Sequence, residues 1–148
     1  MSNELVRIIL VDDHELVRIS WKLLLEMNPL FELVADADNG YTAIEQAQQH
    51  VPDILLVDIN MSPLNGYEVT EKVMAIVPSV KVIGLSVHNQ PHYAWRLLEL
   101  GGRGYFTKTS PLEEIHHGIM EVYKGERYIC REVKRHMTEE EIKRTASG

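Results

Sequence analysis

Residues 7 to 13 of the chain read RIILVDD, a run dominated by β-branched and apolar side chains that ends in two aspartates. Two later segments have the same form: DILLVD at 53 to 58 and VKVIGLS at 80 to 86. Short runs that are mostly apolar on both faces are typical of parallel strands covered by helices on each side. The chain is therefore predicted to have central strands at Arg7–Val11, Asp53–Val57 and Val80–Leu85.

Two weaker segments of the same kind, Phe31–Ala37 and Gly104–Phe106, bring the number of predicted strands to five. Each is followed by a segment with helical spacing. Such an alternation is typical of an α/β fold with a doubly wound five-stranded parallel sheet, (βα)5. Ligands of these sheets bind in the crevice outside the carboxyl ends of the strands. The residues that follow the strands are therefore the candidates for function.

The first helical segment has a largely apolar stripe and a defined end. Asn28-Pro29 stops the helix, because proline cannot continue it. A stripe with steps of three and four residues is typical of an amphipathic helix. Its members are Leu16, Ser20, Leu23, Leu24 and Met27.

Capping residues predict the start of the fifth helix. Ser110 can cap it, Pro111 suits the first helical position, and Glu113 completes an S-x-x-E capping box. Thr138 to Glu141 could cap one more short helix near the end of the sequence.

Composition limits the classes of function. The 148 residues, 45% of them hydrophobic, suit one compact domain. No apolar run approaches the roughly 20 residues that cross a bilayer, and Glu4 lies where a signal peptide would be basic, so we expect a cytoplasmic protein without membrane contact. The single Cys130 excludes an internal disulfide. The net charge of -7 argues against DNA binding by this stretch itself.

The helical and strand pattern stops near Gly125. We predict one domain over residues 1–125 and a charged linker over residues 126–148, in which Arg, Lys and Glu are crowded together.

Five polar residues follow four of the predicted strands and should meet at one edge of the sheet. Three carboxylates held close together repel one another unless a cation lies among them, and oxygen ligands of this kind suit Mg²⁺. A carboxylate can also attack phosphorus and form an aspartyl phosphate where cationic groups stabilise the transferring oxygens. The five residues are Asp12, Asp13, Asp58, Ser86 and Lys108.

The order and spacing of four phrases resemble the receiver domains of two-component response regulators. The phrases are VDDHELVR, LLVDINMSPLNGYE, GLSVH and GRGYFTK, and the resemblance spans residues 5 to 125. The first and last phrases are most similar to the NarL/FixJ (LuxR-type) branch, in which a receiver precedes a helix-turn-helix DNA-binding domain. The resemblance implies a flavodoxin-like receiver fold.

The resemblance also implies a role for each residue of the metal site. Asp58 would accept the phosphoryl group. Asp13 would bind Mg²⁺ directly together with Asp58, the backbone carbonyl of Asn60 would be a third protein ligand, and Asp12 would lie in the outer shell.

A second group of roles concerns the phosphoryl oxygens and the switch. Ser86 and Lys108 would bind these oxygens. Tyr105 matches the aromatic residue whose inward rotation reports phosphorylation in the family.

The partners follow from the same resemblance. A sensor histidine kinase would donate the phosphoryl group, and phosphorylation would favour a homodimer through the fourth helix and fifth strand. DNA would be bound only by a domain absent from this chain, and the output would be regulation of transcription.

The sequence departs from the family pattern after the phosphoacceptor and after Lys108. The usual Met-Pro is replaced by Met61-Ser62-Pro63, which predicts a local change in the loop, and Thr109 stands where many receivers have proline. Two alternatives remain open. An aspartyl-nucleophile phosphohydrolase would need an acid at Asn60, and a phosphate-independent interaction module with the receiver fold would need no phosphorylation.

Trp95 lies off the apolar stripe of the fourth predicted helix. Two interpretations remain open: an exposed ring on a contact surface, or a partly buried ring at the edge of the core.

Overall fold

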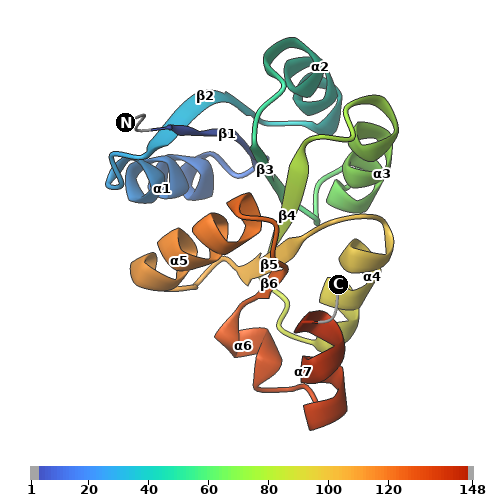
Figure 1. Ribbon diagram of the computed structural model, residues 1–148. Coiled ribbons are helices and arrows are strands. Elements are labelled where there is room, and N and C mark those ends of the chain that lie inside the picture. The colour runs from blue at the N-terminus through green and yellow to red at the C-terminus, as the bar shows by residue number, and fades with distance from the viewer. Residues whose placement is uncertain (1–3, 147–148) are drawn as a thin grey trace.

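The computed structural model describes residues 4–146, and these form a single parallel sheet with helices on both faces (Figure 1). The sheet order is β2-β1-β3-β4-β5-β6, and every neighbouring pair is parallel. The strands of the described residues are β1 (Val6–Val11), β2 (Phe31–Ala37), β3 (Ile54–Asp58), β4 (Lys81–Ser86), β5 (Gly104–Thr107) and β6 (Tyr128–Ile129).

Helices follow each of the first five strands, and two more lie beyond β6. They are α1 (Glu15–Glu26), α2 (Gly40–His50), α3 (Gly66–Ile76), α4 (Pro91–Glu99), α5 (Leu112–Tyr123), α6 (Arg131–Lys134) and α7 (Glu139–Ala146). The predicted (βα)5 architecture is confirmed, with a sixth short strand added at the edge. No helix among residues 4–146 combines the length and apolar character needed to cross a bilayer.

Side chains of β1 alternate between two hydrophobic clusters. Ile8 and Leu10 join the larger cluster, which also includes residues of α1, α4 and α5, whereas Ile9 and Val11 join the cluster formed with α2 and α3. All four are fully buried. Burial of alternate residues on opposite faces explains why these strands are apolar throughout.

The apolar stripe of α1 predicts the helix correctly but does not face the core. Leu16, Leu23 and Met27 are 79%, 61% and 64% exposed, whereas Trp21 and Leu25 on the opposite face are buried. The Trp21 ring centroid lies 6.2 Å from that of Phe106 in β5. The larger aromatic ring fills the space over the sheet, and so the second apolar face of the helix is left on the surface.

The capping box predicted at Ser110 is wrong. Pro111 is the N-cap of α5 and its side chain accepts no capping hydrogen bond, while the Ser110 hydroxyl lies 3.2 Å from the Thr107 hydroxyl. The box at Thr138 and Glu141 is present, since each backbone N–H donates to the other residue's side chain, at 2.9 and 3.2 Å.

The segment after Gly125 differs from the linker that its charges predict. The β6 strand pairs with β5 and closes the edge of the sheet. Ile129, Cys130 and Val133 are at most 1% exposed, so a few apolar side chains anchor the segment.

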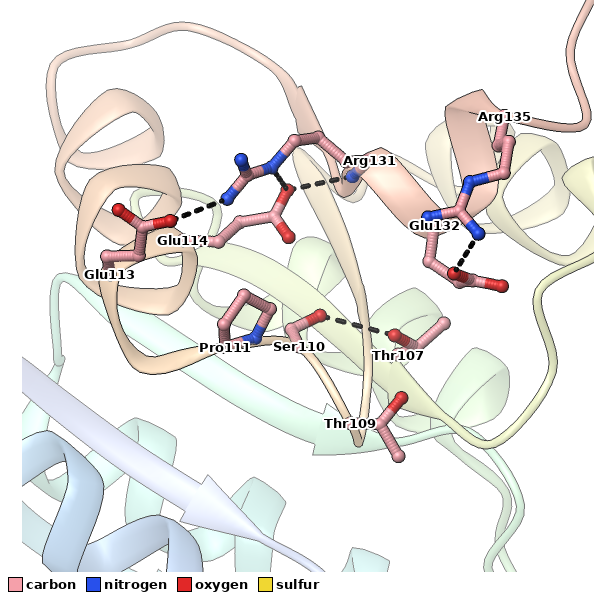
Figure 2. A pocket seen from close by; sticks show the side chains of 9 residues that line it. All are labelled: Thr107, Thr109, Ser110, Pro111, Glu113, Glu114, Arg131, Glu132 and Arg135. Carbon is pink, nitrogen blue, oxygen red and sulfur yellow. Dashed lines mark hydrogen bonds and ion pairs between the residues drawn. The ribbon is translucent and has the colours of Figure 1, made fainter.

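A pair of acidic residues on α5 also holds this segment, as Figure 2 shows. The buried Glu114 carboxylate accepts hydrogen bonds from the Tyr128 hydroxyl at 2.6 Å and the Arg131 backbone N–H at 2.7 Å. Glu113 accepts one from the Arg131 guanidinium at 3.3 Å. Arg131, one of the charged residues for which the sequence predicts a linker, is thus a partner of α5.

Candidate functional site

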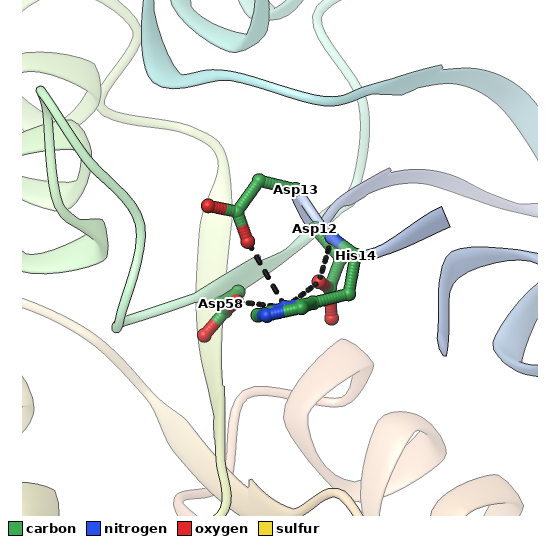
Figure 3. Close-up of side chains that lie close together, drawn as sticks. All are labelled: Asp12, Asp13, His14 and Asp58. Atoms are coloured by element: carbon green, nitrogen blue, oxygen red, sulfur yellow. Dashed lines mark hydrogen bonds and ion pairs between the residues drawn. The ribbon is translucent and has the colours of Figure 1, made fainter. Parts of the chain in front are cut away.

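Three acidic residues and one lysine meet where β1, β3 and β5 end, as the sheet order requires. Lys108 Nζ lies 3.0 Å from both Asp12 Oδ2 and Asp58 Oδ2. Asp12 and Asp58 are fully buried, and Asp13 is more exposed, at the mouth of the site. Figure 3 shows the three carboxylates directed toward one another. The sequence prediction that these side chains converge is confirmed.

Lys108 reaches the site because its backbone N–H donates to the Ser86 carbonyl at 2.8 Å and so continues the pairing of β4 with β5. Burial opposes the charge on its ammonium, but the carboxylates of Asp12 and Asp58 outweigh that effect and raise the pKa of Lys108. The lysine is therefore held as a cation beside the predicted phosphoacceptor.

Burial has the opposite consequence for Asp58. It raises the pKa of the carboxylate, against the lowering effects of the Asn60 N–H and of Lys108. The nearby Asp12 carboxylate raises it further. Negative charge at this edge of the sheet thus exceeds what one lysine neutralises.

The site accordingly has the donors that a divalent cation requires. Asp12 Oδ2 is buried and has no hydrogen bond of good geometry among the described residues, although it lies 3.0 Å from Lys108 Nζ. One side-chain ligand atom from each of Asp12, Asp13 and Asp58 lies within 4.8 Å of the others. Hard carboxylate oxygens at this separation fit Mg²⁺.

His14 belongs to the same cluster, and the sequence prediction missed it. Its Nδ1 lies 3.0 Å from Asp13 Oδ1, 3.2 Å from Asp12 Oδ1 and 3.8 Å from Asp58 Oδ2 (Figure 3). The sequence feature that could have identified His14 is its position directly after the two aspartates. In the structure it is the N-cap of α1.

The loop from β3 to α3 stays closed despite the displaced proline. The Asn60 N–H donates to Asp58 Oδ1 at 2.9 Å, and the Gly66 N–H donates to the Ile59 carbonyl at 3.3 Å. The Ser62–Pro63 peptide bond is cis. The expected local change therefore leaves Asn60 beside Asp58, and its carbonyl remains a predicted ligand.

Ser86 and Tyr105 are joined through the residues that follow β4. The Ser86 hydroxyl donates to Asn60 Oδ1 at 3.0 Å and accepts from the His88 N–H at 3.0 Å. The Tyr105 hydroxyl donates to the His88 carbonyl at 2.7 Å. Tyr105 is fully buried, which raises the pKa of its phenol.

The chain matches the family model described as response regulator receiver domain over residues 8–120. This range contains all the candidate site residues from Asp12 to Lys108 and excludes β6, α6 and α7.

Curated relatives are similar over nearly the whole chain. The transcriptional regulatory protein DegU of Brevibacillus brevis is 36% identical over 135 residues, which are 91% of this chain and 57% of that protein. The response regulator GacA of Pseudomonas viridiflava is 33% identical over 129 residues, 87% of this chain and 60% of the relative. The chain thus spans about three fifths of these relatives' length.

Solved structures agree in fold. A two-component response regulator of the LuxR family from Aurantimonas sp. SI85-9A1 has a TM-score of 0.88 at 27% identity, over 94% of this chain and 99% of that one. The signal receiver domain of the putative response regulator NarL from Mycobacterium tuberculosis has a TM-score of 0.78 at 30% identity, over 82% of this chain and 98% of that one. The chain therefore belongs to the response regulator receiver domain family, on its NarL/FixJ (LuxR-type) branch.

Proposed function

We propose that the chain accepts a phosphoryl group on Asp58 from the phosphohistidine of a sensor kinase. The observation that carries the proposal is the position of the Asp58 carboxylate, which is buried, bound by Lys108 and the Asn60 N–H, and adjacent to Asp12 and Asp13. A carboxylate placed between a cation and a cluster of hard oxygen donors is suited to nucleophilic attack on phosphorus.

In the transfer step an oxygen of Asp58 attacks the phosphorus in line with the bond to the kinase histidine. The new O–P bond forms as the P–N bond breaks, and the electron pair of that bond leaves with the imidazole nitrogen. Lys108 stabilises negative charge on the transferring oxygens. When bound by Asp13, Asp58 and the Asn60 carbonyl, with Asp12 in the outer shell, Mg²⁺ supplies further positive charge there.

The exposed face of α1 supports docking of the kinase beside this site. Leu16 and Ser20 line a groove that continues to Val87, Lys108 and Thr109, so the apolar surface reaches the rim of the acidic cluster. A helix that presents a phosphohistidine can cover this surface and place the phosphorus near Asp58.

The alternative of a phosphohydrolase finds less support. Its general acid would be needed at Asn60, but an amide carries no titratable proton, and Asn60 Oδ1 accepts a hydrogen bond from Ser86. The phosphate-independent module finds less support too, because the full set of Asp12, Asp13, Asp58 and Lys108 is assembled.

Transcriptional regulation is the output we propose for a longer protein that contains this chain. The similar DegU protein is named a transcriptional regulatory protein, and this chain spans 57% of its length. DNA would be bound by a helix-turn-helix domain outside residues 1–148, and phosphorylation would favour a homodimer. The cytoplasmic location remains a prediction from the sequence.

The phosphoacceptor is tested by incubating the chain with Mg²⁺ and acetyl phosphate and measuring the intact mass. We expect one acid-labile phosphoryl group on the wild type and none on Asp58→Asn. Chelation of Mg²⁺ is expected to slow labelling at least tenfold, because the site then lacks its main cation. Labelling of Asp58→Asn to the same extent would reject Asp58 as the acceptor, and steady release of phosphate from small esters would favour the hydrolase.

A further inference from the structure

The outer face of α4 is covered by the last helix of the described chain. Trp95 of α4 donates a hydrogen bond from its indole N–H to Glu141 Oε2 of α7 at 3.1 Å. The Arg144 guanidinium lies over the same ring, 4.7 Å from its centroid. In Figure 1, α7 lies beside α4. The open question about Trp95 is thereby answered: the ring is partly buried, and its cover is a segment of this chain.

A second contact connects the C-terminal segment to residues next to the phosphoacceptor site. Asn89 donates from its side-chain amide to Glu132 Oε2 of α6 at 2.9 Å. Asn89 lies in the β4–α4 loop, residues 87–90, which directly follows Ser86. The same loop holds His88, whose backbone is fixed by Ser86 and Tyr105. One short loop thus touches both the candidate site and α6, the first of the two C-terminal helices.

The two parts of the C-terminal segment are anchored to different degrees. The part with β6 and α6 buries Ile129, Cys130 and Val133 completely. In α7 the side chains are mostly exposed and only Thr145 is buried. Few side chains of α7 are buried, so the helix can leave α4 while β6 stays paired.

The Ser86 hydroxyl has a single proton, and this proton connects the two regions. It is donated to Asn60 Oδ1 in the structure. A phosphoryl group on Asp58 adds strong acceptor oxygens nearby. Ser86 can donate a hydrogen bond to them only if its hydrogen bond to Asn60 breaks. Because Ser86 also accepts from the His88 N–H, such a change alters the support of the β4–α4 loop.

We propose that α7 occupies the outer face of α4 in the unphosphorylated chain and leaves it when Asp58 is phosphorylated, with the β4–α4 loop as the link. This inference rests on the proposed function. Phosphorylation shifts the equilibrium between docked and undocked α7 because Ser86 binds the phosphoryl oxygens better in the undocked arrangement. The Trp95 face, which a helix of the chain covers at rest, is then open to a partner.

The test uses fluorine NMR of the intact chain labelled with 5-fluorotryptophan, whose two signals arise from Trp21 and Trp95. Loss of one signal in Trp95→Phe assigns the two signals. Glu141→Lys is expected to move the Trp95 signal to an undocked position. Glu140→Lys, the same charge change at the exposed neighbouring residue, is expected to leave it in place.

Acetyl phosphate with Mg²⁺ is expected to move the wild-type Trp95 signal toward the Glu141→Lys position. Trypsin cleavage at Lys143 and Arg144 should accelerate at least about fivefold, because cleavage follows the undocked population. A labelled wild-type chain with an unmoved Trp95 signal would overturn the inference, and so would a Glu141→Lys signal identical to the wild type. Absence of any label would instead overturn the proposed function.

Discussion

At the scale of single residues, the buried carboxylates of Asp12 and Asp58 share one permanently charged partner among the described residues, which is Lys108. His14 also lies within salt-bridge distance of both, but it is charged only when protonated. We predict that Lys108→Ala lowers the free energy of unfolding by about 3 kcal/mol in the absence of divalent ions, because it leaves two buried carboxylates without their partner. Added Mg²⁺ should restore part of the loss, since it binds the folded state. Urea denaturation with and without Mg²⁺ measures both effects.

The matched control is Lys124→Ala, which removes a 62% exposed lysine whose ammonium lies 3.9 Å from Glu121. This change should cost less than about 0.5 kcal/mol, because solvent screens the pair. Equal losses for the two variants would show that the buried cluster does not depend on Lys108.

At the scale of elements, the β3–α3 loop depends on a close approach of two backbone segments. A Cβ at Gly66 would lie 2.6 Å from both the Asp58 carbonyl oxygen and Ile59 Cα. We predict that Gly66→Ala destabilises the chain by about 2 kcal/mol and weakens Mg²⁺ binding, because the loop must move away from β3 and take Asn60 with it. Denaturant unfolding and calorimetric titration with Mg²⁺ are the measurements.

Gly125→Ala separates this steric effect from glycine replacement in general. A Cβ at Gly125 has open space, but the backbone φ of +105° disfavours it, so some stability is lost through the backbone alone. Mg²⁺ affinity should remain at the wild-type level in Gly125→Ala. An unchanged affinity in Gly66→Ala as well would reject the link between the loop and the metal site.

At the scale of the whole molecule, the last strand pairs with β5 and the helix after it buries Val133. We predict that a chain ending at Gly125 is less stable by roughly 4 kcal/mol, because the burial of Ile129, Cys130 and Val133 is lost and the β5 edge is opened. Thermal unfolding followed by circular dichroism measures the loss. A chain ending at Arg135, which keeps these three residues and lacks α7, should retain most of the stability. If both truncated chains match the full chain, the segment is a linker after all.

Local patterns in the sequence were sufficient for the first five strands of the sheet and for the convergence of Asp12, Asp13, Asp58 and Lys108. The reason is that strands buried on both faces must be apolar, and the carboxyl ends of parallel strands must share one edge. The position of Asn60 beside Asp58 was also predictable, since only one residue separates them. His14 was missed because a histidine at a helix start has no distinctive pattern.

Contacts between distant residues decided the rest. Which face of α1 is buried depended on the fit of Trp21 to Phe106, because both faces of the helix are apolar in the sequence. The interpretation of residues 126–148 as a linker did not include these contacts, because charge in a segment does not reveal its partners. Arg131 is separated from Glu114 by 17 positions in the sequence, and Trp95 is separated from Glu141 by 46. The sequence by itself determined the order of the first five strands and helices and the convergence of the side chains at the site. The tertiary structure alone decided what covers α4 and closes the sheet, since those outcomes are set by packing and pairing over long separations.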